Sequence, residues 1–276
     1  MTLSVLTLNL WHDRGPWPAR RERIRVWIDQ LAPDLIAFQE VLRVPWLDQL
    51  PDLLGERPYH TAFAAAGSFW RAGREGERGV LGNAIASRFP IASQDTIALP
   101  DAGDGETRCA LSVTALAPPG PVSFTATHLN WKLHHGWVRE QQVVALCDFV
   151  QRRRPKDGFP PILAGDLNAE PESAEIRYVS GLQSLGGWSV AYLDAWRVAG
   201  GPGRGITWSN ANSWARAEHE PDRRLDYVFA GLPRRDGLGQ ILACRVVCDD
   251  EQGGVWPSDH FGVYAELRSE PPEPGE

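Results

Sequence analysis

Hydrophobic and polar positions alternate at the start of the chain, and this pattern predicts a strand over residues 2–10. Residues 16–31 instead place apolar side chains at helical spacing and stop before Pro33, which predicts an amphipathic helix. A short apolar run over residues 34–40 then predicts a second strand. Because strand, helix and strand follow one another, the opening of the chain predicts an α/β layer.

The same two patterns return further along the chain as a second round of elements. Amphipathic runs predict helices over residues 138–153 and 172–182. Apolar or alternating runs predict strands over residues 80–87, 109–116, 122–129, 161–165, 225–230, 241–247 and 261–267. No stretch between these elements resembles a long interdomain linker, so we expect one domain over residues 1–268. The last residues, 269–276, are rich in Glu and Pro and predict a disordered acidic tail.

The composition is that of a folded protein, with 276 residues of which 43% are hydrophobic and 23% are charged. A chain of this length buries about 75% of its unfolded surface, so it can build a core without disulfides or structural metal. The four cysteines show neither a CxxC pair nor a repeated spacing. No apolar run approaches the ~18 residues of a membrane span, and residues 1–10 lack the features of a signal peptide. We therefore expect a cytoplasmic protein without a membrane span.

The charge of the chain is mildly acidic. The formal net charge is −7, and three of the negative charges lie in the tail, so the body carries about −4. This balance does not favour nucleic acid as a partner, because an overall basic surface is missing. Nearly all positive charge is arginine, whose forked group suits phosphate. An anionic substrate would have to be attracted by local arginines, for which the candidates are Arg71, Arg74, Arg78, Arg108, Arg216, Arg223 and Arg224.

Polar side chains that could perform chemistry stand where predicted strands begin or end. They are Asn9, Glu40, His128, Asp166 with Asn168, Asp226, and Asp259 with His260. Sheet ends are where layered α/β folds place active sites. Each residue also has a structural interpretation when it is taken alone, since Asn9 could form a turn and His128 could be a hydrogen-bonded core residue. The Gly165–Asn168 segment could likewise be a tight turn that satisfies local hydrogen bonds.

Taken together and in this order, these residues resemble the endonuclease, exonuclease and phosphatase superfamily. That superfamily contains apurinic endonucleases, pancreatic-type deoxyribonucleases, neutral sphingomyelinases and inositol polyphosphate phosphatases. The matching strings are Thr7–Trp11, Phe38–Glu40, Gly82–Ile85 with Ser87–Arg88, Thr127–Leu129, Gly165–Asn168, Arg224–Val228 and Ser258–His260. The resemblance implies the α+β class, with a four-layer α/β/β/α sandwich of two packed mixed β-sheets and the site at one sheet edge. It also implies a divalent metal, usually Mg²⁺ with Mn²⁺ as an alternative, and hydrolysis of a phosphate ester by direct attack of water.

The resemblance assigns metal binding and water activation to separate residues. Glu40 and Asp259 are expected to bind the metal, and the neutral amide of Asn9 is expected to support them. Mg²⁺ suits such a set because it takes about six oxygen ligands and keeps several waters. Asp166 is expected to orient the attacking water or accept its proton, while the Asn168 amide donates to a phosphoryl oxygen.

Two histidines complete the implied site. His260 is expected to be held by Asp226 and to donate to the phosphate as an imidazolium. His128 is expected to face the phosphate from the opposite side, where it could protonate the leaving group. Apurinic endonucleases carry tyrosine at this position, which argues against an abasic-site enzyme. The four acidic residues of the site would repel one another strongly, so a bound metal is required to neutralise them.

The residues that would select the substrate are less clearly marked. Candidates for substrate binding are Asn83, Arg108, Trp208 and Asn210, although a solvated loop position is the alternative for each. Tryptophans lie beside the expected site loops and could stack on a substrate or anchor the loops, namely Trp70, Trp131, Trp137, Trp208 and Trp214. An adjacent pair, His134 and His135, follows His128 closely and receives no assigned role.

These observations favour a Mg²⁺-dependent hydrolase of phosphoric esters, and more specifically a phosphodiesterase whose partner is a phosphate-ester substrate. A DNA or RNA nuclease is one alternative. A non-catalytic scaffold that binds phosphate is another. The chain has no GxxxxGK phosphate loop and no HExxH motif. It also has no GxSxG nucleophile elbow, and covalent catalysis by Ser or Cys is unsupported.

Overall fold

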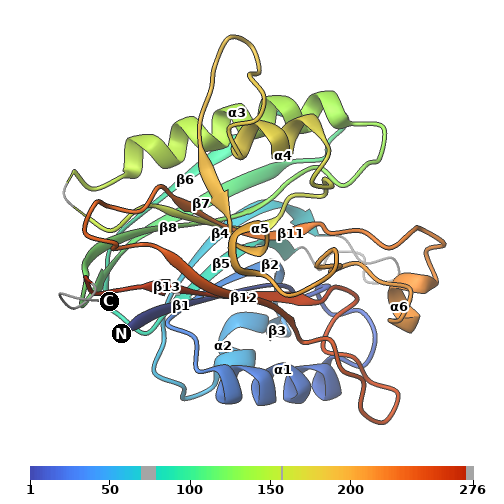
Figure 1. Cartoon of the computed structure of the whole chain (residues 1–276). Helices are drawn as coiled ribbons and strands as arrows, with labels where there is room; N and C mark the ends of the chain where they lie inside the picture. The colour runs from blue at the N-terminus through green and yellow to red at the C-terminus, as the bar shows by residue number, and fades with distance from the viewer. Residues whose placement is uncertain (70–78, 157, 272–276) are drawn as a thin grey trace.

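The chain folds into four layers, as the computed structural model shows for residues 1–69, 79–156 and 158–271 (Figure 1). Two β-sheets pack face to face in the middle of the molecule. Helices α1 (Trp17–Leu31) and α2 (Gln49–Leu54) cover the outer face of one sheet, and α3 (Gly136–Arg153) and α4 (Ala174–Val179) cover that of the other. The α+β sandwich predicted from the sequence is therefore confirmed.

The first sheet has seven strands. Its order is β12 (Ile241–Val247), β13 (Gly262–Arg268), β1 (Thr2–Asn9), β2 (Leu35–Val44), β5 (Gly79–Ser87) and β4 (His60–Phe69), with the short β3 (Leu47–Asp48) paired to β2. Strands β1 and β2 are parallel and are joined through α1, while the other neighbours are antiparallel. A parallel pair needs such a crossover, and the helix supplies it.

The second sheet has six strands and repeats this plan. Its order is β10 (Tyr192–Asp194), β11 (Asp226–Gly231), β9 (Ile162–Asp166), β8 (Gly120–His128), β7 (Arg108–Ala117) and β6 (Ile91–Leu99). Strands β8 and β9 form its parallel pair and are joined through α3. The short helices α5 (Ala195–Ala199) and α6 (Ser213–Arg216) lie in the loops around β10 and β11.

Three apolar clusters hold the layers together. The largest lies between the sheets, where residues such as Leu35, Phe124 and Val228 are at most 1% exposed. On the outer faces, α1 packs through Ile24 and Ile28, and α3 packs through apolar residues of its inner face. Burying one such side chain contributes roughly 1.5–3 kcal/mol, so the clusters fix the strand ends that build the site.

Several elements differ from the sequence prediction. Strands β4 and β6 were not predicted, because β4 is rich in alanine and β6 is polar and mostly exposed at the sheet edge. Helix α4 is shorter than the predicted 172–182, and β2 continues beyond residue 40. Of the predicted tail, residues 272–276 lie outside the described residues, as do Trp70, Arg71, Arg74 and Arg78. Ser269, the first residue of that tail, is buried and its backbone N–H donates to the carbonyl of Met1 at 3.1 Å.

The described part of the chain contains no helix that is both long enough and apolar enough to cross a membrane. All four cysteines are buried, and none of them is joined in a disulfide.

Candidate active site

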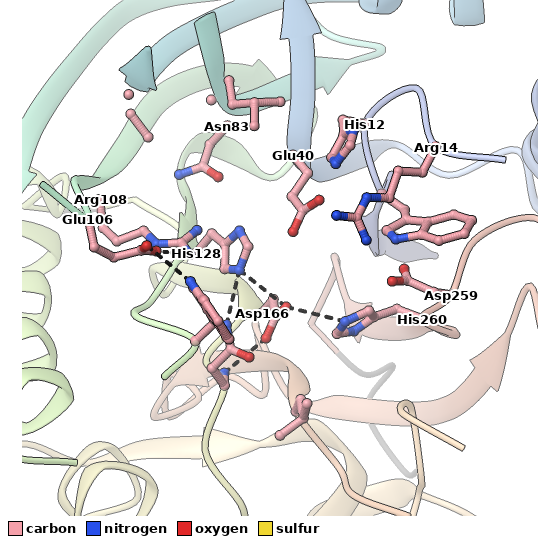
Figure 2. Close-up of a pocket in the computed structure, with 18 of the residues that line it drawn as sticks. His12, Arg14, Glu40, Asn83, Glu106, Arg108, His128, Asp166, Asp259 and His260 are labelled. Carbon is pink, nitrogen blue, oxygen red and sulfur yellow. Dashed lines mark hydrogen bonds and ion pairs between the residues drawn. The ribbon is translucent and has the colours of Figure 1, made fainter. Parts of the chain in front are cut away.

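The two parallel strand pairs bring the predicted site residues to one edge of the sandwich. Asn9 ends β1, and Glu40 lies in the second half of β2. His128 ends β8, and Asp166 ends β9. The carboxyl ends of parallel neighbours lie at the same sheet edge, so the two sheets together surround a pocket of about 680 Å³ (Figure 2). This pocket is also lined by Asn168, Asp259 and His260.

Local backbone geometry fixes the positions of Glu40 and Asp166. In β2, Gln39 and Glu40 lie opposite the single residue Asn83 of β5, so the strand bulges there. Glu40 has a φ of 53°, a left-handed conformation that is uncommon for a residue with a side chain. Before Asp166, a Cβ atom on Gly165 would lie 2.0 Å from the carbonyl oxygen of Thr127, so only glycine lets β8 and β9 approach this closely.

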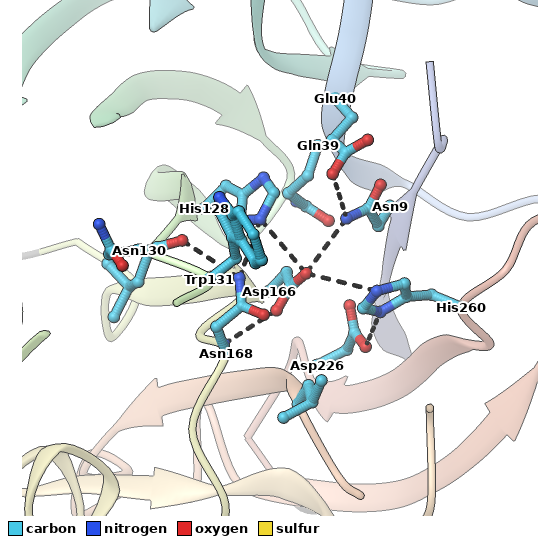
Figure 3. A network of polar contacts seen from close by, with 12 residues as sticks. Asn9, Gln39, Glu40, His128, Asn130, Trp131, Asp166, Asn168, Asp226 and His260 are labelled. Carbon is cyan, nitrogen blue, oxygen red and sulfur yellow. Dashed lines mark hydrogen bonds and ion pairs between the residues drawn. The ribbon is translucent and has the colours of Figure 1, made fainter. Parts of the chain in front are cut away.

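Asp166 is the centre of the polar network (Figure 3). Its Oδ2 accepts from Asn9 Nδ2 at 3.1 Å, and its Oδ1 accepts from the backbone N–H of Asn168 at 2.9 Å. The Nε2 atoms of His128 and His260 lie 3.4 and 3.7 Å from Oδ2. Burial, together with the nearby Asp226, raises the pKa of Asp166 to about 6, although His260 partly opposes this. A carboxylate with such a pKa is suited to accept a proton from water near neutral pH.

His260 is held by Asp226. The distance from His260 Nδ1 to Asp226 Oδ2 is 2.9 Å, and both side chains are buried. Burial alone would lower the pKa of His260, but Asp226, Asp166 and Asp259 together raise it well above its ordinary value. The ring is therefore an imidazolium that can donate from both nitrogens. The edge of Trp208 packs against it with ring centres 4.9 Å apart.

His128 has the opposite protonation state. Burial, Arg108 and His260 hold its pKa well below the ordinary value, so it is a neutral imidazole. Asn168 Nδ2 donates to its Nε2 at 3.0 Å and to the carbonyl of Leu129 at 3.1 Å, which leaves the ring proton on Nδ1. A neutral ring suits hydrogen bonding better than protonation of a leaving group.

These contacts occupy the side chain of Asn168. Both hydrogens of its amide are donated in this arrangement, to His128 and to a backbone carbonyl, so a contact to a phosphoryl oxygen would have to replace one of them. The predicted role of Asn168 toward phosphate stays a prediction. The φ of 49° at Asn168 is another left-handed backbone at the site.

Glu40 and Asp259 form a second acidic group in the pocket. Burial raises the pKa of Asp259 to about 7, and Glu40 adds to this while His260 and Arg20 oppose it. Asn9 Nδ2 is 3.4 Å from Glu40 Oε1, so one amide bridges this group to Asp166. Two neighbouring carboxylates, of which Glu40 raises the pKa of Asp259, offer hard oxygen ligands that fit a divalent cation.

A different set of potential ligands, Asp166, Asp226 and His260, has atoms within 4.8 Å of one another. The Nδ1 atom of His260 is already 2.9 Å from Asp226 Oδ2, and the raised pKa of the ring favours the imidazolium, which has no lone pair to give to a metal. Its positive charge offsets part of the negative charge of the two carboxylates beside it. The chemistry of the donors therefore favours Glu40 and Asp259 for the cation.

Some of the predicted substrate-binding residues line the pocket and others do not. Asn83 and Arg108 line the pocket. Asn83 Nδ2 donates to the carbonyl of Cys109 at 2.9 Å and so links the two sheets, while Arg108 pairs with Glu106 at 2.5 Å. Both side chains thus have structural contacts before any substrate binds.

Trp208 also lines the pocket, whereas Asn210 is not among the lining residues. The Asn210 amide donates to the carbonyl of Glu220 and to the carboxylate of Asp222, both at 2.9 Å, and stabilises its own loop. Of the predicted arginine groups, Arg224 forms a buried ion pair with Asp194 at 2.7 Å. His134 and His135 pack edge to face outside the lining set.

Arg20 was not predicted from the sequence. Its side chain is 0% exposed and donates hydrogen bonds to backbone carbonyls of the site loops. Burial lowers its pKa to about 10, although Asp259 and Glu40 favour its charge. The signal was present in the helix pattern, since Arg20 stands four residues before Ile24 on the apolar face of α1.

Comparison with known proteins gives a family. The sequence model of the Endonuclease/Exonuclease/phosphatase family matches residues 6–260. A search of curated proteins found no significant match. Among solved structures, an endonuclease/exonuclease/phosphatase from Beutenbergia cavernae DSM 12333 is 27% identical with a TM-score of 0.73, and the match covers 97% of this chain and 71% of that one.

Two further structures share the fold at lower identity. D. rerio TDP2 complexed with single strand DNA product is 19% identical with a TM-score of 0.76, over 97% of this chain and 99% of that one. The human nocturnin catalytic domain with bound sulfate anion is 20% identical with a TM-score of 0.70, over 97% and 93%. The family match over most of the sequence shows that this chain belongs to the endonuclease/exonuclease/phosphatase family and is a phosphoric ester hydrolase.

Proposed function

We propose that this protein is a Mg²⁺-dependent phosphodiesterase in which water attacks the phosphorus directly, with Mn²⁺ as an alternative metal. The observation that carries the proposal is the pairing of Asp166, whose pKa is raised to about 6, with the imidazolium of His260 at 3.7 Å. One group can accept a proton and the other can donate a hydrogen bond at the same point of the pocket.

Each side chain then has a defined task. Asp166 accepts the proton of the attacking water, and Asn9 and the Asn168 backbone N–H hold that carboxylate in place. His260 Nε2–H donates to a phosphoryl oxygen as charge builds up there, while Asp226 keeps the ring charged and oriented. A cation bound by Glu40 and Asp259 would neutralise charge on the phosphoryl group.

The charge of the pocket favours a diester over a monoester. Among the described lining residues, six are acidic, namely Glu40, Glu106, Asp166, Glu218, Glu220 and Asp259, and four are cationic, namely Arg14, Arg108, Arg223 and the imidazolium of His260. A monoester at neutral pH carries close to two negative charges and a diester carries one, so the diester experiences less repulsion in this pocket.

A nuclease is the second candidate, and one observation favours it: the similar D. rerio TDP2 structure holds a single strand DNA product. The net charge of −7 argues against binding of long strands. Affinity for oligonucleotides measured against salt concentration separates the two functions, because a nuclease binds at low salt and loses affinity steeply as salt rises. We keep a cytoplasmic location as part of the proposal, since four unpaired cysteines suit a reducing compartment.

The test of the proposal compares hydrolysis of bis(p-nitrophenyl) phosphate and p-nitrophenyl phosphate with Mg²⁺, with Mn²⁺ and with a chelator. We expect the wild type to prefer the diester and to lose activity with the chelator. Asp166→Asn and His260→Asn should each lower kcat by about 10²–10⁴-fold, the range for a positioned acid or base. Asp148→Asn is the matched control, because its side chain is 62% exposed on α3. Full activity in the chelator, or in both site variants, would contradict the proposal.

A further inference from the structure

The loop that follows β1 is held in an unusual conformation beside the metal-binding end of the pocket. Trp11, His12 and Arg14 of this loop line the pocket. Trp11 and His12 have φ angles of 52° and 31°, so two consecutive residues with side chains are left-handed. Such backbone costs of order 1–3 kcal/mol per residue and persists only where the surroundings enforce it.

Arg20 enforces this conformation from beneath the loop. Its guanidinium donates to the carbonyls of Leu10 at 2.8 Å, His12 at 2.7 Å and Arg14 at 2.9 Å. It also donates to the carbonyl of Pro257 at 3.0 Å, next to the Ser258–His260 segment. A fully buried cation that binds several loop carbonyls gives the loop a fixed shape before substrate arrives.

Arg14 is the side chain that this loop presents to the pocket. It is exposed, and within the described residues its guanidinium has no ion pair and donates no hydrogen bond. The other two arginines of the lining are already paired, Arg108 with Glu106 and Arg223 with Glu220. Arg14 therefore offers a guanidinium that has no partner among the described residues, on a loop of fixed shape.

The opposite end of the pocket is neutralised by its own loop. Glu106 pairs with Arg108 at 2.5 Å and also accepts from Trp131 Nε1 at 3.0 Å. Lys132 pairs with Asp104 at 2.5 Å. Trp131 remains 53% exposed and lines the pocket, so the described residues at this end offer an aromatic surface rather than an unpaired cation. Figure 2 shows Arg108, Glu106 and His128 on one side of the pocket and Arg14 with His12 on the other, next to Glu40.

We infer that the pocket binds its substrate in one direction, with a second phosphate group of the substrate at Arg14 and an uncharged, aromatic or apolar ester group at Trp131. This inference rests on the proposed phosphodiesterase function and names its substrate class, a diester that carries a further phosphate on one side only. A guanidinium can form two parallel hydrogen bonds to the oxygens of one phosphate. The face of an indole packs well against a ring or an apolar chain.

Two chromogenic probes test the inference. They are the p-nitrophenyl ester of thymidine 5′-phosphate with a free 3′-hydroxyl, and the same ester with a 3′-phosphate. Both release p-nitrophenolate from the same bond, so they differ only in the second phosphate. In the wild type with Mg²⁺, we expect kcat/KM to be about tenfold higher for the 3′-phosphorylated probe, mainly through a lower KM. One such contact to a charged group corresponds to about that factor.

Arg14→Gln should bring the ratio of kcat/KM for the two probes close to one. Arg14→Glu should bring it below one, and Arg14→Lys should retain part of the preference. Arg235→Gln, an exposed arginine outside the pocket lining, should keep the wild-type ratio. A wild-type ratio of one, or an unchanged ratio in Arg14→Gln and Arg14→Glu, overturns the inference. If the wild type cleaves neither probe with any metal, it is the proposed function that fails.

Discussion

Two histidines of the pocket show how neighbours decide the chemistry of a residue. His128 and His260 are both buried and both lie within 4 Å of the same oxygen of Asp166. His260 also faces Asp226, which makes it an imidazolium, whereas His128 faces an amide and Arg108 and stays neutral. His260 is thus a positively charged hydrogen-bond donor on one side of Asp166, and His128 is a neutral polar group on the other.

The neutral state of His128 predicts a pH dependence of stability. Its pKa in the folded protein is well below 6.5, so below pH 6.5 the unfolded chain binds a proton that the native state does not. The stability that His128 contributes is present above pH 6.5 and is lost as the pH falls towards the folded pKa. Lowering the pH from 7 to 5 should therefore destabilise the wild type relative to His128→Gln. The difference in their free energies of unfolding should change by at most about 1.4 kcal/mol per pH unit.

Urea titrations of both proteins at several pH values measure this difference. Groups distant from His128 titrate alike in both proteins and cancel. Glutamine is uncharged and can still accept the hydrogen bond from Asn168, so the remaining difference reports on His128 and the groups in contact with it, Asp166 and His260. Stability curves that run parallel from pH 7 to pH 5 would show that His128 is protonated in the native state as easily as in the unfolded chain.

At the scale of elements, the sequence predicted those strands and helices that have one clearly apolar face. Helices α1 and α3 and the parallel pairs were predicted within a few residues, because their patterns decide their structure. Strand β6 could not be predicted, because it is exposed along most of its length and pairs only with β7. The bulge at Glu40 could not be predicted either, since it depends on how β2 pairs with β5.

The close approach of β8 and β9 gives a prediction for Gly165. A Cβ atom there would lie 2.0 Å from the backbone oxygen of Thr127, and that oxygen cannot move without breaking the parallel pair. Gly165→Ala should therefore lower the free energy of unfolding by at least about 3 kcal/mol and displace Asp166. Gly201→Ala is the control, because a Cβ atom there has open space around it. Equal stability of the two variants in urea unfolding would show that the strands can separate at this point without cost.

At the scale of the whole molecule, the site depends on pairs of residues that are distant in the sequence. Asn9 and Asp166, 157 positions apart, meet because the two sheets pack with their parallel pairs at one edge. The motifs at strand ends allowed the catalytic and metal-binding candidates to be predicted. The partners that hold Arg108, Arg223 and Arg224 could not be predicted, because nothing in the sequence distinguishes Glu106, Glu220 and Asp194 from the other acidic residues.

The same assembly concentrates negative charge, and this predicts how a metal changes the stability of the molecule. Glu40 and Asp259 share the pocket with Asp166, and only part of their charge is balanced by His260 and Arg20. A cation that binds only the folded chain stabilises it by about 2.7 kcal/mol at 100 times its Kd. For a chain of this size that corresponds to a rise in Tm of roughly 5 °C with Mg²⁺.

Glu40→Gln separates this effect from a general effect of salt. Without metal, the variant should be at least as stable as the wild type, because one of the repelling charges is gone. With Mg²⁺, it should gain much less, because a ligand is missing, whereas Asp148→Asn on the outer face of α3 should gain as much as the wild type. Thermal unfolding with and without Mg²⁺, at constant ionic strength, measures all three proteins. An equal gain in Glu40→Gln and wild type would mean that the cation binds elsewhere, and Asp166, Asp226 and His260 would then have to be reconsidered as its ligands.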